Sequence, residues 1–288
     1  MMIDLHNHIL HGLDDGPETM DESIQMCLMS YRDGVSTIVA TPHTLNGEYQ
    51  NDRPAILAKV KELNDAIKKF GVDSSEFGAK SPKSERSRPF RSEICNLPSD
   101  ISIHSALDPR HSALEILPGA DVHFSNEILH QLDQEEVMTV GDGKKFLILE
   151  FPSHTIPIGA EEVLFQLMAR GIVPVISHPE RNLEITRRPE RYYEMIRMGC
   201  FGQVTAMSLT GGFGGKIKGF AEMLLKKRLI HFIASDAHNV NGRPPILSPA
   251  AKEAEKIVGR EEAQKMVTEY PRAILEGRKP NVPEPIAI

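Results

Sequence analysis

The stretch Met2-Ile3-Asp4-Leu5-His6-Asn7-His8 opens the chain with a short apolar run that ends in two histidines. The pattern of the run predicts a strand over Met2–Leu5. His6 and His8 stand at positions i and i+2, and in extended backbone such side chains point to the same side. Two imidazoles on one side can bind one ion, so this stretch predicts a strand whose end carries metal ligands.

The same kind of short β-rich run recurs along the chain and alternates with helical patterns. Six further strands are predicted at Thr37–Ala40, Leu114–Leu117, Phe146–Glu150, Val173–Ser177, Gly202–Val204 and His231–Ala234. Alternation of strands and helices is typical of βα units around a parallel sheet. The fold class is therefore predicted to be α/β.

Two of the predicted helices have clear boundaries. Thr19 and Glu22 have the spacing of a capping box, and apolar residues then recur on one helical face up to Gly34. A second helix is predicted from Pro54 to Gly71, with apolar residues spaced by three and four. Later helices are predicted around 163–168, 193–196, 217–224 and 254–258.

A His, Asp or Glu stands at or just after the end of six predicted strands. Besides His6 and His8, these residues are His43, Asp121, Glu150, His178, Asp236 and His238. One such residue after a strand is usually a cap or a turn residue, but repetition at six strands favours a shared role. Because the C-terminal ends of strands in a parallel βα barrel converge on one mouth, the sequence predicts a metal centre there.

The types of ligand indicate the chemistry. Imidazoles and carboxylates without thiolates suit Mn²⁺, Fe²⁺ or Zn²⁺, and their number suggests more than one ion. A cluster of ions suits in-line phosphoryl displacement, because it activates water and neutralises the attacking and leaving oxygens. Arg181 and Arg243 each lie a few residues beyond a predicted ligand and are candidates to bind phosphate. For each arginine, a surface salt bridge is the alternative.

The sequence excludes several competing mechanisms. A cysteine phosphatase needs an arginine six positions after its cysteine, but the residues at that offset from the three cysteines are Asp33, Ile101 and Ala206. The glycine-rich run Thr210–Ile217 lacks the P-loop spacing and is predicted to be a turn at the rim of the site. No G-x-S-x-G elbow is present, so a serine hydrolase has no nucleophile.

Composition bounds the class of protein and its compartment. The 288 residues include 33 Lys and Arg against 40 Asp and Glu, and the net charge of −7 argues against a nucleic-acid binder. No apolar run approaches the roughly 20 residues of a transmembrane helix. The N-terminus has no secretory pattern, and the scattered cysteines favour a reducing compartment. We therefore expect a cytoplasmic protein.

The length fits a single domain over residues 1–288, with two segments that differ in composition. Residues 72–111 are rich in Ser, Pro, Lys, Arg and Asp, and they are predicted to form a flexible insertion. Residues 280–288 contain three prolines and are predicted to form a loose tail. The sequence leaves a homo-oligomer open.

Several motifs together resemble those of the polymerase and histidinol phosphatase (PHP) superfamily, and within it the bacterial PHP-type tyrosine-protein phosphatases of capsule and exopolysaccharide systems. The matching stretches are Ile3-Asp4-Leu5-His6-Asn7-His8, Asp14-Asp15-Gly16-Pro17, Ala40-Thr41-Pro42-His43, Leu149-Glu150-Phe151-Pro152, Pro174-Val175-Ile176-Ser177-His178-Pro179-Glu180-Arg181 and Ala234-Ser235-Asp236-Ala237-His238-Asn239. The opening H-x-H alone is shared across the superfamily, whereas D-D-G-P with H-P-E-R and S-D-A-H-N is specific. The resemblance covers most of the chain apart from the insertion.

The resemblance implies a distorted (βα)7 TIM-like barrel (the PHP fold) with three metal ions, commonly manganese. By position, it assigns the first ion to His6, His8 and Asp236, the second to Glu150 and His178, a bridge between these two to Asp121, and the third ion to Asp15, His43 and His238. Arg181 and Arg243 match the family's phosphate-binding arginines. The leaving group is expected to take its proton from a bound water or a nearby acid such as Asp15 or His43.

The implied activity is hydrolysis of phosphotyrosine on a protein, such as a cognate bacterial tyrosine kinase that controls polysaccharide export. One departure concerns Asp121, which is one methylene shorter than the usual bridging Glu, so we expect a different bridge or ion spacing. Two other functions compete: a phosphatase of a small ester such as histidinol phosphate, and a non-catalytic PHP binding module. The near-complete ligand set argues against the module. A phosphodiesterase or nuclease is disfavoured by the negative charge.

Overall fold

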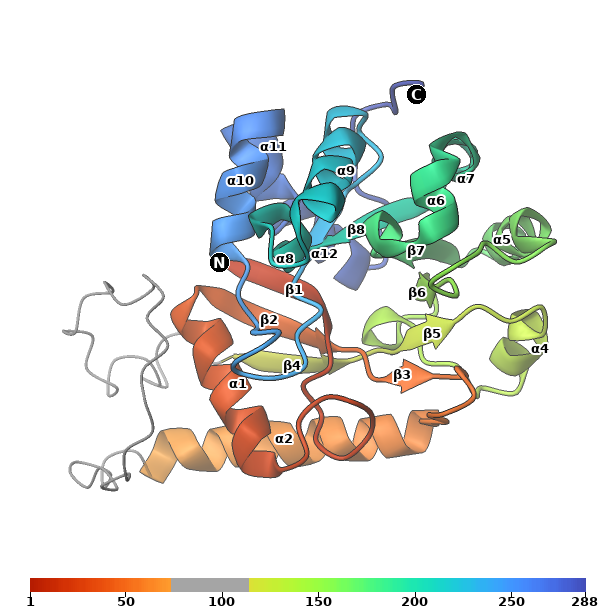
Figure 1. The fold of residues 1–288 in the computed structure, drawn as a ribbon. Coiled ribbons are helices and arrows are strands. Elements are labelled where there is room, and N and C mark those ends of the chain that lie inside the picture. The colour runs from red at the N-terminus through yellow and green to blue at the C-terminus, as the bar shows by residue number, and fades with distance from the viewer. Residues whose placement is uncertain (74–113) are drawn as a thin grey trace.

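Parallel strands form the centre of the molecule. The computed structural model describes residues 1–73 and 114–288, without the side chains of 70–73, as an α/β fold (Figure 1). One sheet has the order β1-β2-β4, and the other has the order β3-β5-β6-β7-β8-β9. The strands are β1 (Met2–Asn7), β2 (Val35–Ala40), β3 (His43–Thr44), β4 (Glu115–Pro118), β5 (Asp121–His123), β6 (Phe146–Glu150), β7 (Val173–Ser177), β8 (Phe201–Thr205) and β9 (Phe232–Ala234). Every pairing between these strands is parallel.

All seven predicted strands are present, and the structure adds β3 and β5. These short strands continue the chain after β2 and β4 and pair in the second sheet instead of the first. Pro42 has no N–H for a ladder, so it suits the point where β2 gives way to β3. At Gly119, between β4 and β5, a Cβ would lie 2.6 Å from Val39 Cγ1, so only glycine fits there without a shift.

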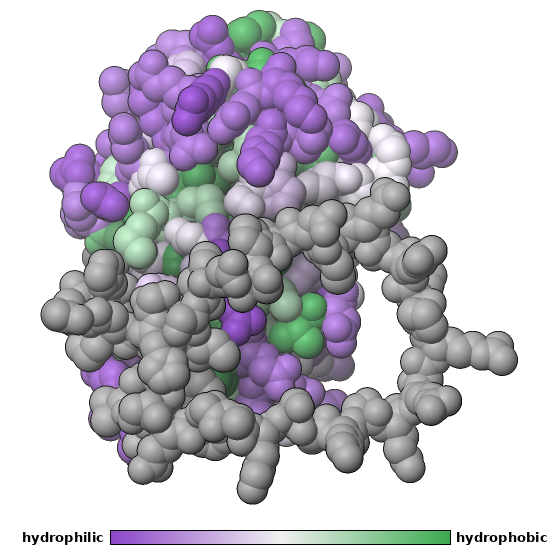
Figure 2. Space-filling model, turned by 90° about the vertical axis from the view of Figure 1, so that its left-hand side faces the viewer, coloured by the Kyte–Doolittle hydropathy of each residue, from purple (hydrophilic) through white to green (hydrophobic). Residues whose placement is uncertain are grey.

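Helices cover the outside of the strands, with α2 on one side and α9 and α10 on the opposite side (Figure 1). They are α1 (Met20–Arg32), α2 (Arg53–Asp73), α4 (Ile128–Asp133), α5 (Ala160–Ala169), α6 (Leu183–Arg187), α7 (Pro189–Met198), α8 (Ala206–Thr210), α9 (Gly215–Lys226), α10 (Ser248–Val258), α11 (Arg260–Lys265) and α12 (Glu269–Leu275), with 3-10 turns η1 (Val140–Asp142) and η2 (Pro179–Arg181). On the face shown in Figure 2, the upper part of the molecule is mostly hydrophilic.

The first two helices agree with their sequence signals. Thr19 Oγ1 accepts a hydrogen bond from Glu22 N, and the Glu22 carboxylate accepts one from Thr19 N, so the predicted capping box is confirmed. Helix α2 continues past Gly71 to Asp73, two residues into the predicted insertion. Residues 74–111 of that insertion lie outside the described residues.

Backbone hydrogen bonds join the end of β1 to the residues just after β9. Asp236 N donates to His6 O at 2.8 Å, and His8 N donates to Ala237 O at 2.9 Å. At the opposite end, β1 and β9 instead donate hydrogen bonds to the backbone of 266–267, between α11 and α12. The described residues thus form two parallel sheets joined at this seam, and the closed seven-stranded barrel stays a prediction.

The remaining predictions about the chain concern its tail, its cysteines and membranes. Residues 280–288 form no helix or strand, and Ile286 N donates to Lys227 O at 2.9 Å. Whether the tail is loose stays a prediction. Cys27 and Cys200 are buried free thiols, and Cys95 lies outside the described residues. Among the described helices, none combines the length and apolarity needed to cross a bilayer.

Candidate metal centre

The two histidines at the end of β1 point into the same buried site. His6 Nε2 and His8 Nε2 lie 3.1 Å apart, and both residues are fully buried. Their second ring nitrogens have different partners. His6 Nδ1 lies 3.0 Å from Gln203 Oε1, whereas His8 Nδ1 lies 2.6 Å from Asp14 Oδ2.

The structure brings all nine predicted ligands together. His43 and Asp121 begin β3 and β5, the short strands that follow β2 and β4, instead of ending a strand. Potential ligand atoms lie within 4.8 Å of one another in three overlapping groups: His8, Asp15, His43 and His238; His6, His8 and Asp121; and His43, Asp121 and Glu150. The two remaining residues join these groups, because His178 Nε2 lies 3.4 Å from Glu150 Oε1 and Asp236 Oδ1 lies 3.5 Å from His8 Nε2.

Asp121 lies in the middle of the cluster, and its surroundings show whether these residues fit a cation. Its Oδ2 atom is buried without a hydrogen-bond partner. It lies 3.6 Å from His6 Nε2 and 3.5 Å from His43 Nδ1. Ligand atoms that share an ion at about 2.1 Å lie about 3.0–3.4 Å apart, so these spacings fit metal ligands. A buried carboxylate oxygen without a donor is costly, and a cation would satisfy it.

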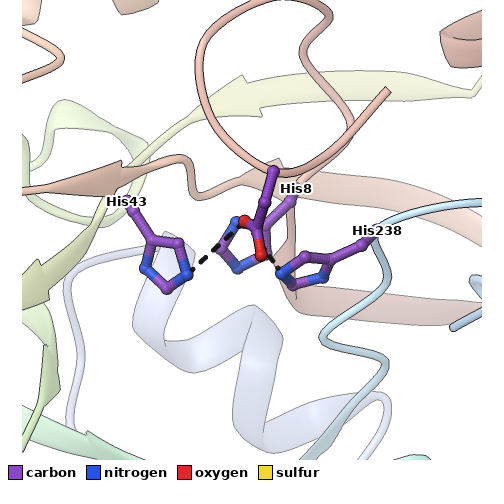
Figure 3. Close-up of side chains that lie close together, drawn as sticks. His8, His43 and His238 are labelled. Carbon is purple, nitrogen blue, oxygen red and sulfur yellow. Dashed lines mark ion pairs between the residues drawn. The ribbon is translucent and has the colours of Figure 1, made fainter. Parts of the chain in front are cut away.

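One group is built around Asp15, which comes from the loop after β1. Asp15 Oδ1 lies 3.3 Å from His238 Nε2 and 3.7 Å from His43 Nε2, and Figure 3 shows these imidazoles and that of His8 gathered around one carboxylate. The neighbouring imidazole of His238 holds the pKa of Asp15 well below its usual range. Since Asp15 follows no strand directly, only the family resemblance pointed to it.

The surroundings shift the pKa values of the two β1 histidines in opposite directions. Burial lowers the pKa of His6 to about 4, even though Asp121 and Asp236 act against that shift. Burial also lowers the pKa of His8, but the carboxylates of Asp14 and Asp236 outweigh it and raise the value to about 10. The two imidazoles therefore differ in basicity although they lie side by side.

Two of the predicted ligands have strained backbones. His178 has φ +34° and Asp236 has φ +52°, in the left-handed region that residues other than glycine rarely adopt. Each such residue costs roughly 1–3 kcal/mol, so the surroundings must hold it in place. Next to Asp236, Ser235 Oγ donates to Asp4 Oδ2 at 2.5 Å and Ser235 N donates to Asp4 Oδ1 at 2.9 Å. Burial raises the pKa of Asp4 to about 6.

Both predicted phosphate-binding arginines meet on one oxygen of Asp236. Arg243 Nη2 lies 2.6 Å from Asp236 Oδ2, and Arg181 Nη2 donates to the same atom. The side chains of Arg181 and Arg243 are 23% and 25% exposed, and Asp236 is 2% exposed, so these are not surface salt bridges. Each arginine also has a buried Nε without a partner.

The arginines and the cluster line a common cavity of about 140 Å³. Its polar wall includes Arg181, Arg243, His43, Glu150, His178 and Asp236. Phe151 and Ile185 give it an apolar wall. A small anion with an apolar substituent would match both walls.

Sequence reasoning missed several residues beside the cluster, among them His123, Gln203 and Phe213. His123 is not among the predicted ligands, yet its Nδ1 lies 3.5 Å from Glu150 Oε2. Its i+2 spacing from Asp121 on β5 was the available signal. Gln203 was missed because a neutral residue inside a strand gives no signal. Phe213 lies in the glycine-rich run after α8, and its ring centroid is 5.2 Å from Arg181 Cζ. The run was predicted to lie at the rim of the site, but a role for this side chain was not.

Comparison with known proteins decides the family. The model of the family described as "Capsular polysaccharide synthesis, CpsB/CapC" matches residues 2–77 and 86–276. The chain belongs to the CpsB/CapC family. The resemblance drawn from the motifs is therefore confirmed.

The relatives of this CpsB/CapC chain match nearly its whole length. Tyrosine-protein phosphatase YwqE of Bacillus subtilis (strain 168) is 33% identical over 277 residues, which cover 96% of this chain and 92% of YwqE. Tyrosine-protein phosphatase CpsB of Streptococcus pneumoniae is 28% identical over 279 residues, covering 95% and 98% of the two chains.

A solved structure gives the same result. It comes from the crystal structures of YwqE from Bacillus subtilis and CpsB from Streptococcus pneumoniae, described as unique metal-dependent tyrosine phosphatases. It matches with a TM-score of 0.82 and 31% identity, covering 100% of this CpsB/CapC chain and 99% of the other. The α/β fold is thus shared with these proteins.

Proposed function

We propose that this CpsB/CapC protein is a metal-dependent tyrosine-protein phosphatase. The observation that carries the proposal is the position of Asp236, which faces the histidine cluster with Oδ1 and both arginines with Oδ2. A centre for cations and a site for a phosphate group thus share one residue and one cavity. The activities named for YwqE and CpsB support the same reaction class.

We assign the ions as the family pattern implies. His6, His8 and Asp236 would hold the first ion, Glu150 and His178 the second, Asp121 would lie between these two, and Asp15, His43 and His238 would hold the third. When bound, such ions act as Lewis acids that lower the pKa of water and neutralise charge on phosphate oxygens. Manganese is our first choice of metal, with Fe²⁺ and Zn²⁺ as alternatives, because the ligands mix imidazole and carboxylate.

The chain's own residues bind and orient the phosphate. Arg181 and Arg243 present guanidinium groups to the cavity, and their shared bond to Asp236 fixes them before a substrate arrives. Such preorganised donors stabilise the charge that develops on phosphoryl oxygens. Between the two candidate proton donors, the geometry favours His43, because His43 lines the cavity and Asp15 does not.

The substrate class follows from the apolar part of the cavity. Phe151 and Ile185 offer contact to an aromatic ring attached to the phosphate, which fits phosphotyrosine better than phosphoserine. The family description, capsular polysaccharide synthesis, supports a tyrosine kinase of that process as the protein substrate. We accordingly propose a cytoplasmic location, with which the free thiols of Cys27 and Cys200 agree.

We also propose that residues 1–288 work as one domain with a distorted (βα)7 barrel. Strands of both sheets contribute to the cluster, since His6 lies in β1 of the first sheet and Glu150 in β6 of the second. The backbone bonds between β1 and the end of β9 support the closure.

A rate assay tests the proposed function. The purified protein is given a phosphotyrosine peptide, the matched phosphoserine peptide or histidinol phosphate, each with Mn²⁺ and with a chelator. We expect manganese-dependent release of phosphate, fastest from phosphotyrosine, and no activity in His6→Ala. Preference for histidinol phosphate would assign a biosynthetic phosphatase instead, and bound metal without turnover would indicate a binding module.

A further inference from the structure

Asp14 is the neighbour of the predicted ligand Asp15 and has a different environment. The side chain of Asp14 is fully buried, whereas that of Asp15 is 49% exposed. Its Oδ2 atom lies 2.6 Å from His8 Nδ1. This is a short contact between a carboxylate and an imidazole, typical of a charge-assisted hydrogen bond.

The same carboxylate accepts two backbone hydrogen bonds from other parts of the site. His43 N donates to Asp14 Oδ2 at 2.9 Å, and Gly16 N donates to Asp14 Oδ1 at 3.0 Å. Asp14 therefore connects the end of β1, the loop that carries Asp15, and the beginning of β3. These segments supply three members of the group formed by His8, Asp15, His43 and His238.

The loop is packed so closely that this arrangement has little freedom. A Cβ on Gly16 would lie 2.3 Å from His8 O, so a larger residue there would push the loop away from β1. The close approach of Gly16 keeps Asp14 within reach of His8. In the sequence Asp14-Asp15-Gly16, Asp14 is a buried hydrogen-bond acceptor and Asp15 is a half-exposed predicted ligand. Gly16 has no side chain, which lets the loop pack against β1.

The contact also decides which ring nitrogen of His8 faces the cluster. With Nδ1 held against Asp14, Nε2 faces the cluster, 3.1 Å from His6 Nε2 and 3.5 Å from Asp236 Oδ1. Carboxylates in this position fix the orientation of a metal-binding imidazole and raise its basicity as a ligand. His6 has a neutral amide, that of Gln203, in the equivalent place.

We propose that Asp14 is a positioning residue of the metal centre, which holds His8 through Nδ1 and keeps His43 and Asp15 in the same group. The inference rests on the proposed function only in assuming that the cluster binds cations. It adds that the affinity for those cations depends on a residue outside the ligand set.

The test measures Mn²⁺ binding, not activity. Wild type, Asp14→Ala and Asp14→Asn are stripped with a chelator, and their Mn²⁺ affinity is measured by competition with a fluorescent chelator. Removal of such a partner typically weakens metal binding about 10–100-fold, and we expect that loss for Asp14→Ala. Asp14→Asn keeps the shape but not the charge, and we expect a smaller loss of at least a few-fold.

Asp33 offers a matched control. Its carboxylate also accepts two backbone hydrogen bonds, from Leu247 N at 2.6 Å and Ser248 N at 2.9 Å, and it connects α1 with α10 instead of the cluster. We expect Asp33→Asn to lower the melting temperature and leave the Mn²⁺ affinity unchanged.

The outcomes separate the two claims. If wild type binds no Mn²⁺, Fe²⁺ or Zn²⁺, the proposed metal centre is wrong. If wild type binds and a folded Asp14 variant binds equally well, the positioning role is wrong. Should Asp14→Ala fail to fold by circular dichroism, Asp14→Asn decides, and wild-type affinity in that variant overturns the inference.

Discussion

Asp236 Oδ2 lies 2.6 Å from Arg243 Nη2, while the other oxygen of the same carboxylate lies 3.5 Å from His8 Nε2. One buried side chain thus contacts both the predicted ligands and the predicted phosphate-binding arginines. The arginines cannot move far without breaking this contact. A change at Asp236 is therefore expected to disturb metal and phosphate together, whereas a change at an arginine should disturb phosphate alone.

Arg181→Ala and Arg243→Ala should each lower kcat/KM for a phosphotyrosine peptide by roughly 10–100-fold, because a hydrogen bond to a charged group is worth about 1.5–3 kcal/mol. The Mn²⁺ content per chain, measured by elemental analysis, should stay at the wild-type level. Wild-type rates in both variants would contradict the phosphate-binding role. Arg170 is a suitable control, because it pairs with Asp133 away from the cavity.

Asp236→Asn should weaken both metal binding and phosphate binding. The amide keeps the shape but removes the charge that the two arginines share, and it is a poorer metal ligand. We expect weaker Mn²⁺ binding by at least 10-fold and weaker inhibition by inorganic phosphate. A variant with normal metal content and normal phosphate inhibition would show that Asp236 does not connect the two functions.

Phe213→Leu should mainly raise KM. The ring of Phe213 lies over the guanidinium of Arg181, and a partly exposed contact of this kind contributes about 0.5–1 kcal/mol. The expected change is a rise of about 2–5-fold in KM for the phosphotyrosine peptide, with little change in kcat. Phe213→Tyr keeps an aromatic face and should restore the wild-type value, so equal effects in both variants would argue against the ring contact.

Manganese should stabilise the folded protein. A ligand that binds only the native state adds about 2.7 kcal/mol at a concentration 100 times its Kd, which corresponds to a melting temperature roughly 5 °C higher. Differential scanning fluorimetry after chelator treatment measures this shift. Ca²⁺ prefers sites made entirely of oxygen and should give a much smaller one. Equal shifts for both ions would contradict the imidazole-rich site.

His231 should make the fold sensitive to acid. The imidazole is 4% exposed, accepts a hydrogen bond from Gly202 N at 3.0 Å, and burial lowers its pKa from 6.5 to about 3. As the pH falls below 6.5, the unfolded chain binds a proton at this residue and the native chain does not. The free energy of unfolding should then fall by up to about 1.4 kcal/mol per pH unit from this residue alone.

Urea unfolding between pH 7 and pH 4, in the presence of a chelator, checks this dependence. In His231→Asn an amide oxygen can replace Nδ1 as acceptor, so the variant should fold but lose stability less steeply with acid. If the free energy of unfolding falls with pH equally steeply in wild type and His231→Asn, His231 contributes nothing to the acid sensitivity.

Much of the fold and of the cluster could be predicted from the sequence, because strand period and strand ends are local signals. His6, His8 and Glu150 were found in this way, since each stands at the end of a buried strand. At Pro42 and Gly119 the chain passes from the first sheet to the second, and this was not predicted. It depends on which strands pair in the folded protein, and local sequence does not indicate that pairing.

The residues that hold the cluster in place were harder to predict. Asp4 and Asp14 are carboxylates whose partners, Ser235 and His43, lie far along the chain or in another segment. A buried charge in the middle of the apolar strand β1 was a signal for Asp4, but nothing local indicates what it contacts. In the Asp14-Asp15-Gly16-Pro17 motif, only Asp15 was predicted to have a role, as a metal ligand.

The seam between β1 and β9 has a consequence for how the protein is made. Asn7 and Ser235 are 228 positions apart in sequence yet hydrogen-bonded, and the cluster takes members from both ends of the chain. During synthesis, His6 and His8 leave the ribosome long before Asp236 and His238 exist. The nascent chain therefore cannot assemble its full cation site until residue 238 has been translated, so the site forms only after β9 has been made.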